Sequence, residues 1–111
     1  MVKGCYLTLF IREDRRHGDQ LLYEWLLQTA RELGISGGSA FKAIAGFGRH
    51  GVLHESHFIE LGGELPIEVG FMLSNEEADL LLGKIRSEGL RMVYARMPAE
   101  IGLVEGVDTS V

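Results

Sequence analysis

The sequence predicts an α+β domain with the ferredoxin-like βαββαβ order, in which an antiparallel sheet carries both helices on one face. Four segments alternate apolar and polar residues with the period of a β-strand. Two further segments show helical apolar spacing, one after the first strand and one before the last. This order is the split βαβ arrangement. Because each crossover is right-handed, both helices are expected on the same face.

Residues 4–34 are expected to form the first strand and the first helix. The strand is read from residues 4–11, where every second side chain is apolar and the rest favour β-structure. After a charged segment, the helix is expected to begin near Gly18. Gly34 is expected to end it in a left-handed cap. Its apolar stripe consists of Leu22, Leu26, Thr29 and Leu33, with Trp25 beside it.

Alternation predicts three more strands, at Ser39–Phe47, Leu65–Leu73 and Arg91–Met97. Between the first two, residues 52–61 are polar on both faces, which favours an edge strand or a hairpin arm. Ser74 and Glu77 have the spacing of a capping box, so the second helix is expected to begin there and to stop near Gly89. The chain is then one domain over residues 1–111, with residues 99–111 as a C-terminal tail.

The sheet face opposite the helices is expected to carry large apolar side chains mixed with Thr8, Lys42 and Glu68. These apolar residues are Tyr6, Phe10, Ile44, Met72, Met92 and Tyr94. A soluble monomer rarely exposes so large an apolar patch. We therefore expect the protein to self-associate through this face.

Composition excludes several classes of protein. The chain has 111 residues, a net charge of −5 and scattered basic residues, which argues against nucleic-acid binding. The single cysteine, Cys5, excludes an intramolecular disulfide framework. The apolar run at residues 5–11 is too short to span a membrane and no signal-peptide cleavage pattern follows it, so a cytoplasmic protein is expected. No familiar catalytic motif is present, and an enzyme is not expected, although small ferredoxin-like enzymes exist without one.

The segment at residues 43–51 is the main candidate for ligand binding. Gly46 and Gly48 can bring backbone amides close to an anion, Arg49 can pair with phosphate, and Phe47 can supply apolar contact. A structural role stays open as well, because small residues also let a strand bend and pack tightly against a neighbouring subunit.

Three histidines follow within eight residues: His50, His54 and His57. With His17 nearby they could converge on a divalent metal, which needs at least three donors. Solvated histidines on an edge strand are the alternative.

The string Ile44-Ala-Gly-Phe-Gly48, followed by Arg49, resembles the Gly-Phe-Gly-Arg stretch of PII signal-transduction proteins. Further agreement lies in the opening strand, in the turn Glu13-Asp14…His17-Gly18 and in Leu22-Tyr23-Glu24. Over roughly residues 4–98 the chain is similar to a family of short bacterial PII-like proteins, domain of unknown function family 190.

This resemblance implies a homotrimer whose sheets pack around a three-fold axis. It implies that an adenine nucleotide or a small anion binds between subunits at Gly46, Phe47, Gly48 and Arg49. It also implies a regulatory protein that signals to a partner such as a membrane transporter or an enzyme. PII-like trimers include proteins linked to divalent-cation tolerance, so a trimeric metal-binding protein is the alternative function.

The sequence also departs from PII proteins. Where they carry a second loop rich in glycine and lysine, residues 86–91 hold only Gly89 and flanking arginines. Residues 99–111 contain no basic residue. We therefore expect a ligand with one or two phosphates, or a small anion, rather than tight binding of a triphosphate.

Overall fold

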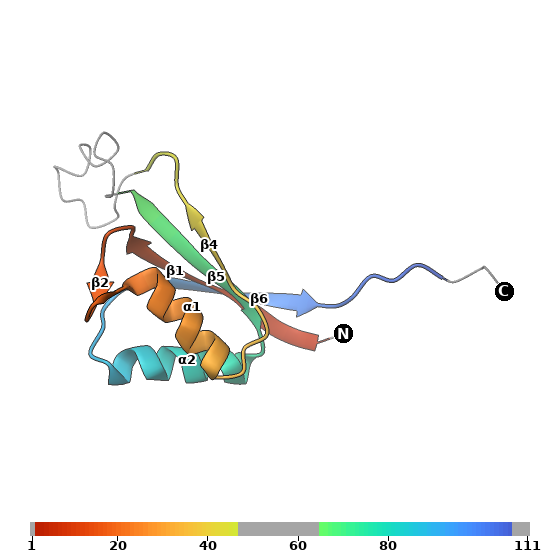
Figure 1. Ribbon diagram of the computed structural model, residues 1–111. Coiled ribbons are helices and arrows are strands. Elements are labelled where there is room, and N and C mark those ends of the chain that lie inside the picture. The colour runs from red at the N-terminus through yellow and green to blue at the C-terminus, as the bar shows by residue number, and fades with distance from the viewer. Residues whose placement is uncertain (1, 47–64, 108–111) are drawn as a thin grey trace.

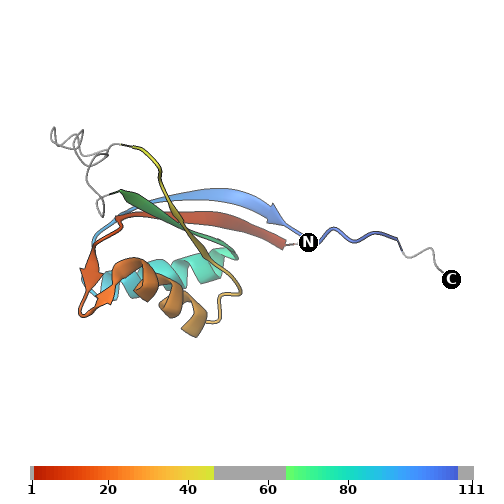
Figure 2. The ribbon, with the colours of Figure 1, turned by 45° about the horizontal axis from the view of Figure 1, so that its top comes forward.

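The computed structural model describes residues 2–46 and 65–107 of the chain. In order, its elements are β1 (Val2–Arg12), β2 (Arg16–His17), β3 (Gln20–Leu21), α1 (Leu22–Glu32), β4 (Ser39–Lys42), β5 (Pro66–Leu73), α2 (Asn75–Ser87) and β6 (Val93–Ile101). The main sheet is antiparallel with strand order β4-β5-β1-β6. Both helices cover one of its faces (Figures 1 and 2). The predicted ferredoxin-like fold class is confirmed.

The hydrophobic core lies between the sheet and the two helices. Strand β1 runs through the middle of the sheet and pairs with β5 on one side and β6 on the other. Its alternation places Cys5, Leu7, Leu9 and Ile11 in the core, as the sequence predicts. The apolar stripes of α1 and α2 cover these side chains, and they include Leu22, Leu26, Leu81 and Leu82.

Helix α1 begins later than expected and ends as expected. Residues 16–21 pair as the short hairpin β2–β3, so the helix starts at Leu22 and not near Gly18. At its end Gly34 has a φ of 87°, and the next residue, Ile35, donates its N–H to the carbonyl of Ala30 at 3.0 Å. This is the left-handed cap that the glycine predicts.

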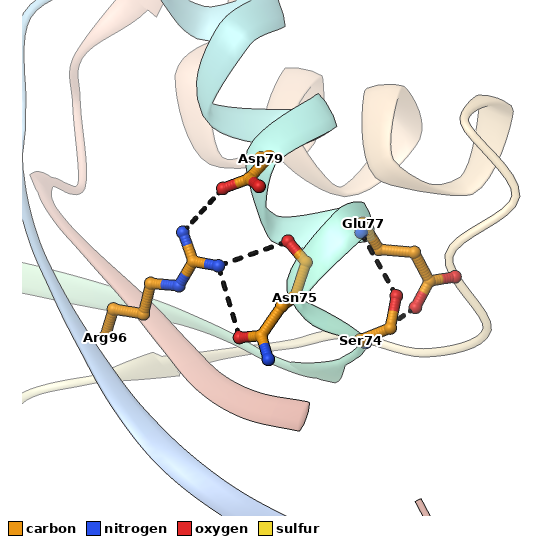
Figure 3. A network of polar contacts seen from close by, with 5 residues as sticks. All are labelled: Ser74, Asn75, Glu77, Asp79 and Arg96. Carbon is orange, nitrogen blue, oxygen red and sulfur yellow. Dashed lines mark hydrogen bonds and ion pairs between the residues drawn. The ribbon is translucent and has the colours of Figure 1, made fainter. Parts of the chain in front are cut away.

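Helix α2 begins with the predicted capping box. Glu77 N–H donates to Ser74 Oγ at 3.1 Å, and Ser74 N–H donates to Glu77 Oε1 at 2.9 Å (Figure 3). Next to it, Arg96 of β6 donates to Asp79 Oδ1 at 2.8 Å and to the carbonyl of Asn75 at 3.1 Å. The hydrogen bond to Asp79 raises the pKa of Arg96, and the contact ties β6 to the first turns of α2.

Two strands end several residues away from their predicted ends. Strand β4 ends at Lys42 rather than at Phe47, and residues 43–46 follow outside regular structure. Strand β6 continues through Pro98 to Ile101, so the segment outside the sheet starts at Gly102 and not at residue 99. A proline is tolerated there because β6 is an edge strand of the described sheet.

The face opposite the helices, here called the open face, differs in part from the expected one. Tyr6 lies opposite Met72 and Met97, and Phe10 lies opposite Glu68 and Val93, so these residues share a face. By the same pairing this face includes Tyr6, Thr8, Phe10, Phe41, Glu68, Met72, Val93, Ala95 and Met97.

Four expected members of the open face are wrongly placed. Tyr94 lies opposite Leu9 and Lys42 lies opposite Ile67, which puts both on the helix side. Met92 packs against the core, and Ile44 lies beyond the end of β4. A change of one residue in register moves every side chain of a strand to the other face, which accounts for the errors in β4 and β6.

Candidate functional site

The connections 13–21 and 88–92, together with the residues at both ends of the β4–β5 connection, gather at one end of the domain (Figure 1). We call it the connection end. Of the ligand-binding residues predicted from the sequence, the structure describes Gly46 alone. Phe47, Gly48 and Arg49, and the histidines His50, His54 and His57, lie outside the described residues.

Gly46 lies just past the last backbone pairing of β4 with β5. That pairing is the hydrogen bond from Ala43 N–H to the carbonyl of Pro66 at 2.9 Å. The φ of Gly46 is not positive, and a Cβ built on it would make only an ordinary contact, at 3.7 Å, with the ring of Pro66. Neither backbone conformation nor packing within the described chain therefore requires glycine at this position.

An ion pair stands between the end of β1 and the end of β4. Lys42 Nζ lies 3.0 Å from Glu13 Oε2, and Glu13 N–H donates to the carbonyl of Leu65 at 3.1 Å. The second carboxylate oxygen, Glu13 Oε1, is buried and has no hydrogen-bond partner within the described part of the chain. A buried acceptor without a donor costs free energy. The ion pair with Glu13 holds the half-exposed side chain of Lys42 at the end of β4.

The neighbouring Arg12 is already engaged. Its Nε and Nη2 atoms donate to the carboxylate of Asp14 at 3.0–3.1 Å. A guanidinium held in this bidentate way has less capacity for a ligand phosphate. Lys42 is paired as well, through its 3.0 Å contact with Glu13.

His17 lies against Glu88 at the end of α2. Its Nε2 is 2.9 Å from Glu88 Oε1, and its ring packs edge-on against Trp25 with centroids 4.9 Å apart. Lys84 Nζ lies 3.3 Å from the other oxygen of Glu88. Within the described residues no group of three His, Cys, Asp or Glu side chains could hold a metal ion.

Gly89 has a structural role in the same region. Its φ is 71°, and its N–H donates to the carbonyl of Arg86 at 3.0 Å, so it ends α2. Arg15 Nη1 then donates to the carbonyl of Arg91 at 2.6 Å. The loop from α2 to β6 is thereby fixed against the start of β2.

The contact between His17 and Glu88 predicts a pH-dependent effect. The hydrogen bond from His17, with a smaller contribution from Lys84, holds the pKa of Glu88 below its ordinary value. A carboxyl group with a lowered pKa stabilises the fold at pH values above its ordinary pKa. This stabilisation is lost as the pH falls through the lowered pKa. We expect His17→Ala to raise the pKa of Glu88, measured by carbon-detected NMR titration of its carboxyl group. Lys84→Ala should give a smaller rise, and an unchanged midpoint in the His17 variant would contradict the contact.

Comparison with known proteins assigns the chain to a family. The family model DUF190, described as Uncharacterized ACR, matches residues 4–94. The chain belongs to the DUF190 family. It is 30% identical to the UPF0166 protein of Aquifex aeolicus (strain VF5) over 88 residues, which are 79% of this chain and 84% of that protein. It is 28% identical to the UPF0166 protein MJ1524 of Methanocaldococcus jannaschii over 97 residues, covering 84% and 89% of the two chains.

Solved structures show that this DUF190 protein has the fold of PII-like signalling proteins. One neighbour, classed with PII-like signalling proteins, is from Thermus thermophilus, with a TM-score of 0.60, 18% identity and coverage of 88% and 87% of the two chains. Another is CPII of Thiomonas intermedia K12, a nitrogen regulatory PII-like protein, with a TM-score of 0.58, 15% identity and coverage of 91% and 97%. The CPII structure contains ADP, AMP and bicarbonate.

No helix among residues 2–46 and 65–107 is both long enough and apolar enough to cross a membrane. The resemblance to the DUF190 family that the sequence shows is confirmed by the family model.

Proposed function

We propose that this DUF190 protein is a PII-like regulatory protein without catalytic activity, which binds an adenine nucleotide or a small anion between subunits. In this proposal the ligand changes how the assembly meets a protein partner, such as a membrane transporter or an enzyme. The observation that carries the proposal is the fold, which extends over 91% of the chain in the comparison with CPII, a protein bound to ADP, AMP and bicarbonate.

The open face supports an assembly of several copies, which we propose to be a homotrimer. In the isolated chain Phe41, Met72 and Met97 are 59%, 60% and 52% exposed, although all three are large and apolar. Tyr6 and Phe10 join them on the same face. Packing such faces together would remove this apolar area from water, which is the main favourable term in association.

The ligand is proposed to lie at the connection end, against Gly46, Phe47, Gly48 and Arg49. Two features of the described residues support this location. A glycine that packing in the described chain does not require leaves its backbone accessible, and Lys42 presents an ammonium held by Glu13. Charge-assisted hydrogen bonds are worth roughly 1.5–3 kcal/mol each, so two of them give only millimolar affinity. Apolar contact with the rest of a nucleotide must supply the remainder.

Calorimetric titration with AMP, ADP, ATP and bicarbonate tests the proposal. We expect ADP or AMP to bind at least as tightly as ATP, and Arg49→Ala to weaken binding about ten-fold or more, the loss expected from one charge-assisted hydrogen bond. Gly46→Ala should also weaken binding while leaving the fold intact, because the structure has room for the added methyl group.

The matched control is Lys3→Ala, which removes one positive charge at the start of β1, far along the sheet from the connection end. It should leave the affinity unchanged. If none of the four compounds binds, or if Arg49→Ala and Lys3→Ala behave alike, the proposed site is wrong.

A further inference from the structure

Residues 102–107, here called the C-terminal arm, leave the sheet after β6 and run away from the rest of the domain (Figures 1 and 2). Leu103, Val104 and Val107 are 82%, 97% and 87% exposed. Within the described part of the chain, no backbone hydrogen bond joins the arm to a loop, turn or helix cap. It therefore presents apolar side chains that its own described chain does not cover.

A groove of about 280 Å³ lies beside α1, near the other edge of the sheet, and we call it the α1 groove. Its apolar lining comes from Leu27, Ala30, Ile35 and Phe71, and residues 36–38 also line it. Cavities of roughly 150 Å³ accommodate a benzene molecule. The α1 groove is thus large enough for two aliphatic side chains.

The rim of the α1 groove carries a positive charge available for pairing. Arg31 lines the groove, and within the described residues its guanidinium makes no hydrogen bond or ion pair. The adjacent Glu32 is engaged elsewhere, because its carboxylate accepts a hydrogen bond from Gln28 at 3.3 Å. The groove therefore combines apolar walls with one cationic rim.

The C-terminal arm has the complementary pattern. Successive side chains of an extended segment point to opposite sides. In an extended conformation Leu103, Glu105 and Val107 share one side, with a carboxylate between two apolar groups. Glu105 makes no ion pair within the described part of the chain.

We propose that the C-terminal arm of one copy lies in the α1 groove of a second copy, with Glu105 paired to Arg31. The arm leaves from β6, which is separated from β4 by β5 and β1, and it runs away from its own domain (Figure 1). A neighbouring copy is therefore the occupant that this direction favours. This exchange of arms requires two copies to meet, and it requires no bound ligand.

Photo-crosslinking of the full chain tests the exchange. Gly106→Cys places a thiol on the side of the arm away from Glu105, in open space, and a benzophenone maleimide can be attached there. The native Cys5 is buried and should not react, which the unaltered protein checks under the same conditions. After irradiation we expect a crosslinked dimer on a denaturing gel, with the crosslink mapped to residues 27–38.

Charge reversal then tests the pairing. Glu105→Arg should lower the dimer yield by a factor of up to about five, the range expected for an exposed ion pair. Adding Arg31→Glu to the same chain should restore it. Glu76→Arg, which reverses an exposed charge on α2, should leave the yield unchanged.

A crosslink that maps outside residues 27–38, or one found only within single chains, would overturn the exchange of arms. Failure of the charge pair to rescue the yield would overturn the contact between Glu105 and Arg31. Calorimetry with ADP on the Glu105→Arg protein reports on the proposed ligand site separately, so either idea can fail while the other stands.

Discussion

Replacing Leu81 by alanine is expected to lower the free energy of unfolding by about 2–5 kcal/mol, the usual cost of truncating a buried leucine. Leu81 lies on the core side of α2 and is 0% exposed. The substitution removes apolar contact and leaves a cavity, and alanine itself favours a helix, so no loss of helix propensity adds to the result. The total free energy of unfolding of a small domain is only about 5–15 kcal/mol, so this loss is a large share of it.

The neighbouring Leu80 provides a matched control, because it stands on the same helix and is 55% exposed. Leu80→Ala should change the free energy of unfolding by no more than about 0.5 kcal/mol, as for most surface substitutions. Urea denaturation of both variants at one protein concentration makes the comparison, since self-association would make stability depend on concentration. Equal losses in the two variants would show that the described face of α2 is wrong.

Replacing Met72 by aspartate is expected to dissociate the oligomer that we propose. Met72 lies on the open face, opposite Tyr6, and packing between copies would bury it. Burying an unpaired charge costs several kcal/mol even after relaxation, and each 1.4 kcal/mol is about a factor of ten in association. We therefore expect sedimentation equilibrium to show at least about a hundred-fold weaker association.

Leu80→Asp is the control for this second experiment. Leu80 and Met72 have similar exposed fractions, 55% and 60%, but Leu80 lies on α2 and away from the open face. This variant should assemble like the unaltered protein. An unaltered protein that is monomeric at micromolar concentration, or a Met72→Asp variant that assembles normally, would refute association through the open face.

Local signals predicted much of the fold correctly. The capping box of Ser74 and Glu77, the glycine cap at Gly34 and the alternation of β1 each depend on residues a few positions apart. Such signals act through short-range hydrogen bonds and steric preferences, which the sequence displays directly.

The edge strands were harder to predict because their two faces are similar in polarity. Strand β4 contains Ala40 and Phe41 in succession, and β6 contains Val93 and Tyr94 in succession. Either residue of each pair could face the core by hydrophobicity alone. The pairing with β5 and with β1 settles the register, and it reverses the faces assigned to Lys42 and Tyr94.

The candidate site was predictable only as a local pattern. The glycines and Arg49 stand next to one another in the sequence, whereas Glu13 and Lys42 come together only when β1 and β4 lie in one sheet. The pairing of His17 with Glu88 likewise joins the hairpin before α1 to the end of α2. In both pairs, the sequence around one residue gives no signal of the residue that it contacts.

The central place of β1 has a consequence for how the chain reaches its fold. Among the described elements β1 comes first in the chain, yet both strands that flank it follow residue 65. Contacts between residues so distant in sequence slow folding, because the closure of long loops must come before the contacts that reward it. The apolar side chains of β1 consequently stay incompletely covered until β6, the last described strand, has paired with β1. In the cell this interval is when the nascent chain is most exposed to aggregation.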